Sequence, residues 1–272
     1  MNTLLPPITL TGEVLMPRLG FGVFRAGPAT QSAVLTALRV GYRHVDTARV
    51  YKNEADVGEA IRRSGVPRGE LFVTTKLWNQ DHGYDDARRA CDESLRLLGL
   101  DRLDLYLIHW PAAGKRAETW RAMEAILADG KARAIGVSNY MVHHLRELEG
   151  TARVLPAVNQ IELHPFLHQR DVVAHCEALG IAVSAYSPLT KGKRLADPAL
   201  GAIAGEVGRT PAQVLIRWCL QRGWPTMPKS VTLERIAENF GALDFALQGD
   251  VMRRLDALED GTRCAWDPST VV

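Results

Sequence analysis

The sequence predicts an α/β fold, a (β/α)8 TIM barrel with an N-terminal β-hairpin and an extra C-terminal helix. Short apolar runs alternate repeatedly with helix-like segments, and a glycine follows most of those segments. The 272 residues are long enough for one such barrel. We therefore expect residues 1–272 to form a single domain.

The predicted elements begin with a hairpin over residues 8–16, whose turn is Thr11, Gly12 and Glu13. Barrel strands are expected at 19–22, 43–46, 71–76, 103–109, 134–138, 157–162, 181–186 and 225–228. Helices are expected at 30–40, 54–64, 85–98, 118–129, 142–149, 169–179, 210–221 and 235–240, with the extra helix at 248–258. Thr30 is the candidate N-cap of the first helix.

Glycine marks the expected helix ends, because it adopts the left-handed C′ conformation without steric cost. The positions are Gly41, Gly65, Gly99, Gly130, Gly150, Gly180 and Gly223. A doubly wound sheet, the competing fold, would need G-x-G-x-x-G opening a helix after a strand. Gly20-Phe21-Gly22 lacks the third glycine and the helix, so the barrel is favoured.

The composition is that of an ordinary globular protein, with 46% hydrophobic and 24% charged residues. A net charge of +2 gives no attraction to nucleic acid or to an anionic membrane, and we expect neither partner. No apolar run is long enough to span a bilayer, and no secretory signal is seen, which predicts a cytoplasmic protein. The four cysteines lack CxxC spacing and are expected to be reduced thiols.

Four polar residues follow the ends of three successive predicted strands. They are Asp46, Tyr51, Lys76 and His109. Strand ends converge on one face of a barrel, so these side chains should meet there. Reduction of a carbonyl needs a hydride and a proton, and the side chain that gives the proton works best with a pKa near the working pH.

Each of these residues has a separate chemical role in the hypothesis. Free tyrosine has a pKa near 10, and a nearby ammonium lowers it. Lys76 can do this for Tyr51, while Asp46 keeps Lys76 charged. His109 would donate a hydrogen bond to the substrate oxygen. Each residue alone is more often structural, but the four together predict a carbonyl-reducing site.

At these residues the chain resembles the aldo-keto reductase superfamily. Residues 41–54, 135–140 and 228–239 resemble its three signatures, and residues 158–165 support the same membership. Within the superfamily, the chain most resembles the branch around bacterial 2,5-diketo-D-gluconate reductases. The resemblance implies that Asp46, Tyr51, Lys76 and His109 are catalytic, that Tyr51 is the proton donor, and that NADPH is the cofactor.

The same resemblance assigns residues to the cofactor. Tyr186 would stack on the nicotinamide, while Ser138, Asn139 and Gln160 would hold its carboxamide. Lys229, Ser230 and Arg235 would face the 2′-phosphate, and Glu238 and Asn239 the adenine. The remaining cofactor-binding candidates are Ser187, Leu189, Val231 and Thr232.

The phosphate end also follows from the barrel itself. The loops after the seventh and eighth strands, residues 187–194 and 229–232, offer cations and hydroxyls where such barrels bind anions. The guanidinium of Arg235 suits a phosphate. Thr232 stands where some relatives carry a second arginine, which leaves the preference for NADP over NAD open.

Aromatic residues near the expected mouth are candidate substrate-binding walls beside His109. They are Phe21, Phe24, Trp78, Trp110 and Trp266. Trp266 is expected either to fold back over the mouth or to lie in a free tail. No metal site is expected: HExxH is absent, His143 and His144 point apart on a helix, and His164 is interpreted as structural.

The leading hypothesis is an NADPH-dependent reductase of small aldehydes, keto sugars or related carbonyls. A cofactor-sensing binding module of the same fold is the alternative, and turnover distinguishes them. A phosphate-substrate isomerase would leave Tyr51 and Lys76 unexplained. A short loop over residues 111–117 suggests an open pocket. The resemblance favours a monomer.

Overall fold

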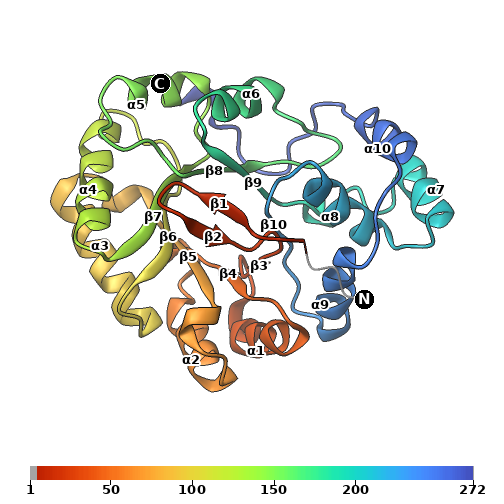
Figure 1. The fold of residues 1–272 in the computed structure, drawn as a ribbon, viewed down its shortest axis with the longest axis horizontal. Coiled ribbons are helices and arrows are strands. Elements are labelled where there is room, and N and C mark those ends of the chain that lie inside the picture. Colours follow the sequence, from red (N-terminus) through yellow and green to blue (C-terminus); the bar gives the residue numbers. More distant parts are fainter. Residues whose placement is uncertain (1–4, 272) are drawn as a thin grey trace.

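The computed structural model describes residues 5–271 and confirms the predicted barrel. Its parallel strands surround a common centre (Figure 1). They are β3 (Phe21–Gly22), β4 (His44–Asp46), β5 (Phe72–Leu77), β6 (Leu103–Ile108), β7 (Ala132–Ser138), β8 (Val158–Glu162), β9 (Ala182–Tyr186) and β10 (Thr226–Met227). Neighbours in space are neighbours in sequence, and a parallel bridge from Leu19 to Thr226 joins the first strand to the last. The C-terminal strand ends therefore share one rim, called the C-terminal rim below.

Helices form the outer ring (Figure 1). They are α1 (Thr30–Val40), α2 (Glu54–Ser64), α3 (Tyr84–Leu98), α4 (Arg116–Ala128), α5 (Val142–Glu149), α6 (Arg170–Ala178), α7 (Pro198–Glu206), α8 (Pro211–Gln221), α9 (Leu233–Phe240) and α10 (Gly249–Asp256). The approach of α2 to α3 depends on Gly58, because a Cβ there would lie 2.3 Å from the backbone oxygen of Leu98.

The N-terminal hairpin consists of β1 (Ile8–Leu10) and β2 (Val14–Met16) and crosses the barrel in Figure 1. Leu10, Val14 and Met16 are buried in a cluster with Phe72, the first residue of β5, and Ala157, which directly precedes β8. The hairpin therefore closes the N-terminal end of the barrel and leaves the C-terminal rim open. Among residues 5–271, no helix is long and apolar enough to cross a membrane.

The structure corrects three details of the prediction. Helix α7 was not expected, although Asp197 followed by Pro198 is a helix-start signal, and the Asp197 carboxylate caps the amides of Ala199 and Leu200. Thr30 is not the N-cap of α1 but its first residue, and its hydroxyl donates to the carbonyl of Gly27 in a preceding 3-10 turn. Gly150 ends α5 with ordinary right-handed geometry.

Candidate active site

A buried ion pair forms the base of the C-terminal rim. Asp46 ends β4, and Lys76 lies in β5 two residues beyond Thr74, the register partner of Asp46. Both side chains reach the barrel interior, where the Lys76 Nζ lies 2.6 Å from Asp46 Oδ1 and donates to the Thr47 carbonyl at 2.9 Å. Burial lowers the pKa of Lys76, and the Asp46 carboxylate opposes that shift. The ammonium is thus held in a nearly water-free place by one countercharge.

Tyr51 lies beside this pair in a 3-10 turn, Arg49–Tyr51, after β4. The Lys76 Nζ is 5.5 Å from the centre of its ring, and the rings of Phe24 and His109 flank it at 5.0 and 5.6 Å. The expected lowering of the Tyr51 pKa is wrong for this state. Burial of the phenol, followed by the nearby Asp46 carboxylate, raises the pKa well above 10.

His109 follows β6 and is 8% exposed. Burial, assisted by the charge of Lys76, lowers its pKa well below 6.5, so the ring is neutral and carries one N–H. Its Nδ1 is buried without a hydrogen-bond partner among the described residues. A neutral imidazole at this rim can donate one hydrogen bond to a bound oxygen.

An amide network covers the neighbouring strand ends. Asn139, with φ of 64°, donates from Nδ2 to the His109 carbonyl at 2.9 Å and accepts from the Tyr186 hydroxyl at 2.8 Å. Ser138 donates to the carbonyl of Gln160 at 2.7 Å. The Gln160 side chain itself donates to Asp46 Oδ2 at 2.9 Å, so it completes the ion pair, a role that the sequence did not reveal.

The expected phosphate end is assembled between β10 and the start of α9. Ser230 accepts from the Thr232 amide and donates to the Thr232 carbonyl, which fixes the turn before the helix. Burial lowers the pKa of Lys229, and Arg235 is exposed in the first turns of α9. Cations at a helix N-terminus suit an anion.

The remaining predicted cofactor residues lie near the Asn139 network or near the turn before α9. Glu238 accepts from Thr210 at 2.6 Å and Asn239 is buried. Val231 is exposed, and Ser187 and Leu189 are partly buried in the loop after β9.

Four of the five aromatic candidates surround the mouth. Trp78 packs edge-on to His109 at 5.4 Å, and Trp110 stacks beside His109 at 6.4 Å. Trp266 folds back from the C-terminal tail to within 5.0 Å of Trp110, and Phe24 packs against Tyr51. Phe21 is the exception: it is 1% exposed and packs on Tyr42 in the core, so it forms no wall.

Potential metal ligands gather in one place among residues 5–271: Glu162, His164 and Cys264 lie with ligand atoms within 4.8 Å of one another. The carboxylate of Glu162 already accepts three hydrogen bonds, from His164 and from the amides of Cys264 and Ala265. His164 contacts this carboxylate through its Nε2, and its structural role stays a prediction. All four cysteines are buried free thiols, as expected.

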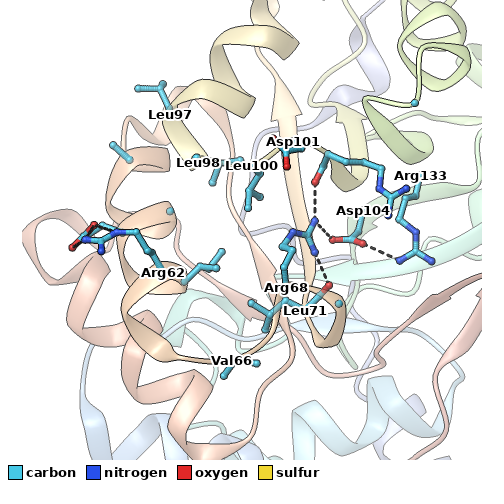
Figure 2. Close-up of a pocket in the computed structure, with 18 residues that line it drawn as sticks. Arg62, Val66, Arg68, Leu71, Leu97, Leu98, Leu100, Asp101, Asp104 and Arg133 are labelled. Atoms are coloured by element: carbon cyan, nitrogen blue, oxygen red, sulfur yellow. Dashed lines mark hydrogen bonds and ion pairs between the residues drawn. The ribbon is translucent and has the colours of Figure 1, made fainter.

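A large cavity of about 880 Å³ lies away from this site (Figure 2). It opens between α2, α3 and the N-terminal starts of β6 and β7. Arg68 and Arg133 both pair with the buried Asp104, and Arg68 also donates to the carbonyls of Leu71 and Arg102. These groups satisfy one another, so the network is structural.

A barrel that holds an ion-paired lysine, a tyrosine and a neutral histidine at its C-terminal rim is typical of a carbonyl-reducing oxidoreductase. The chain belongs to the aldo/keto reductase family, whose model matches residues 18–260.

Relatives of known name match along nearly their full length. The chain is 50% identical to morphine 6-dehydrogenase of Pseudomonas putida, over 98% of this chain and 95% of that one. It is 48% identical to 9,11-endoperoxide prostaglandin H2 reductase of Trypanosoma cruzi, over 96% and 94%. The crystal structure of an aldo-keto reductase from a Medee basin deep-sea metagenome library superimposes with a TM-score of 0.94 at 40% identity, covering 97% of this chain and 99% of that one.

Proposed function

We propose that this protein reduces aldehydes and ketones to alcohols with NADPH, and that Tyr51 is the proton donor. The observation that carries the proposal is the buried Lys76–Asp46 pair beside Tyr51 and the neutral His109 on one rim. Burying an ion pair costs free energy and adds little stability even when hydrogen bonds satisfy it, which favours a use other than stability. Next to a tyrosine, the use is stabilisation of the phenolate left after proton donation.

The high pKa of Tyr51 fits a donor. A buried phenol stays protonated at neutral pH, and an alkoxide is a far stronger base than a phenolate, so the proton moves downhill to the product oxygen. The neutral His109 donates a hydrogen bond to the same oxygen and orients the carbonyl. Asp46, held by Gln160, keeps Lys76 charged for the step.

The donor set fits a nicotinamide dinucleotide phosphate. Asn139 offers a fixed amide, Tyr186 an aromatic face beside it, and Lys229, Ser230 and Arg235 an anion site at α9. When bound, the cofactor would supply the hydride. We include in the proposal that Ser138, Gln160, Ser187, Leu189, Val231, Thr232, Glu238 and Asn239 also contact it.

The substrate proposal rests on the rim and on the relatives. Their names, morphine 6-dehydrogenase and prostaglandin H2 reductase, support large apolar substrates besides small aldehydes. Keto sugars stay in the proposal through the resemblance to the diketogluconate reductase branch. We propose further that residues 1–272 act as one domain, as a monomer in the cytoplasm.

The test is titration of the purified protein with NADPH and with NADH, followed by protein fluorescence and then by a panel of carbonyls. We expect tighter binding of NADPH and oxidation of NADPH that depends on a carbonyl. Binding without turnover on a broad panel would favour a cofactor-sensing module. Binding of neither nucleotide would contradict the proposal.

A further inference from the structure

Glu162 is a buried carboxylate with no role in the proton transfer described above. It ends β8 and is 1% exposed. Its Oε1 accepts from the Cys264 amide at 2.7 Å, and its Oε2 accepts from the Ala265 amide at 3.0 Å. The Nε2 of His164 lies 3.2 Å from Oε1. Both carboxylate oxygens therefore accept a hydrogen bond from the backbone of the C-terminal tail, residues 259–271.

Further contacts hold the same tail on either side of Trp266. The Lys191 ammonium donates to the Cys264 carbonyl at 2.7 Å, so this residue is held through both its N–H and its C=O. Farther on, Nε2 of His143 and of His144 lie 3.0 and 2.7 Å from the Val271 oxygen, so the expectation that these two rings point apart is wrong. Trp266 thus projects from a backbone that is anchored before and after it.

Trp266 cannot hold its own position by burial, because 56% of it is exposed. Its ring lies 5.0 Å from that of Trp110 at 53°, and Trp110 stacks on His109 with an interplanar angle of 18°. A tail residue with so little buried surface depends on its backbone anchors for a defined orientation. The nearest anchors are the two amides that Glu162 holds and the Cys264 carbonyl that Lys191 holds.

We propose that Glu162 is a positioning residue of the substrate pocket: it fixes Trp266 against Trp110 and thereby sets a preference for carbonyls that carry a flat apolar group. The inference rests on the proposed function. Such a group can stack on the Trp110–Trp266 wall, whereas a small hydrophilic carbonyl is held by Tyr51 and His109 alone. An oriented aromatic contact is worth about a 3- to 10-fold change in binding.

The experiment compares 4-nitrobenzaldehyde with glyoxal in steady-state kinetics of E162Q, W266A and the double variant. The E162Q side chain has nearly the same shape as the carboxylate but only one acceptor oxygen. Its NH2 group therefore faces one of the two tail N–H groups, and two donors meet without an acceptor. E177Q is the matched control, since it makes the same charge change at an exposed position of α6. Far-UV circular dichroism checks folding, and E162D serves if E162Q does not fold.

We expect E162Q and W266A each to raise KM for the aromatic aldehyde about 3- to 10-fold relative to KM for glyoxal, whereas E177Q should leave kcat and KM for both aldehydes within about two-fold of wild type. The double variant should be no worse than W266A, because both act through the same ring. Equal losses for both aldehydes, an additive double variant, or E162Q behaving like E177Q would overturn the inference.

Failure of the proposed function is distinguishable from failure of this inference. A wild-type protein that reduces neither these aldehydes nor any carbonyl of the broad panel with NADPH refutes the proposed function. Near-UV circular dichroism then decides the positioning role, because W266A identifies the signal of the Trp110–Trp266 pair. Loss of that signal in E162Q supports the role of Glu162, and its retention refutes it.

Discussion

The Lys76–Asp46 pair gives the sharpest test of the site, through stability rather than turnover. The perturbation is D46N, which keeps the size of the side chain and removes the countercharge. Lys76 would keep the Thr47 carbonyl at 2.9 Å as a neutral acceptor, but the ammonium is 1% exposed and no water replaces the lost charge.

The size of the effect follows from the geometry. At 2.6 Å and an effective dielectric constant of about 20, the attraction between the two charges is about 6 kcal/mol. Part of this offsets the cost of burying them, and breaking one side of such a pair costs about 3–5 kcal/mol. D46N should therefore lower the free energy of unfolding by about that amount.

The assay is a double-mutant cycle in urea, with D46N, K76M and the two combined. K76M leaves the Asp46 carboxylate with the Gln160 amide as its remaining side-chain donor, so it should also destabilise. The double variant buries no charge and should lose no more than either single variant, a coupling of about 3 kcal/mol or more.

Additive losses would refute this reasoning. They would mean that the two side chains act independently, and that Lys76 is either neutral or solvated in the folded protein. D46N with unchanged stability would lead to the same conclusion.

Three further predictions concern catalysis, packing and pH. Y51F should lower kcat about 10²- to 10⁴-fold, because it removes the proton donor. The NADPH dissociation constant, measured by fluorescence, should stay within about two-fold of wild type, because the ring contacts remain. Full activity of Y51F would exclude Tyr51 as the donor. G58A places a Cβ 2.3 Å from the Leu98 backbone oxygen and should destabilise by about 3 kcal/mol, whereas G201A, in open space on α7, should stabilise by up to about 1 kcal/mol in the same urea assay. Burial lowers the pKa of His44 from 6.5 to about 4. As pH falls from 6.5 to 4, His44 is therefore protonated in the unfolded chain but not in the folded protein, and the folded protein loses stability. This loss is worth about 3 kcal/mol and should be missing from the pH profile of H44Q; an unchanged profile would contradict it.

The C-terminal tail contributes one wall of the apolar side of the rim. Three tryptophans, Trp78, Trp110 and Trp266, form its apolar side, and two of them follow strands of the barrel. The third comes from a segment about 160 residues later in the chain and is placed by backbone hydrogen bonds. Substrate preference should therefore respond to residues that never touch the substrate.

The barrel and the four catalytic candidates could be predicted from the sequence because the relevant patterns are local. Apolar runs and glycine stops identify the elements, and the parallel topology then brings Asp46, Lys76 and His109 to one rim. Helix α7 was missed because its apolar residues show little one-sided pattern, and the Asp197-Pro198 start alone did not identify it.

The tertiary structure decided the features that depend on long-range partners and on the balance of burial and charge. Gln160 donates to Asp46 across 114 residues, and Glu162 holds amides more than 100 residues away. Phe21 lies in the core although its sequence position suited a pocket wall. The direction of the Tyr51 pKa shift was set by desolvation of the phenol and by the nearby Asp46 carboxylate. Sequence patterns report which face of an element is apolar, whereas hydrogen-bond partners and the local dielectric exist only once the elements have packed.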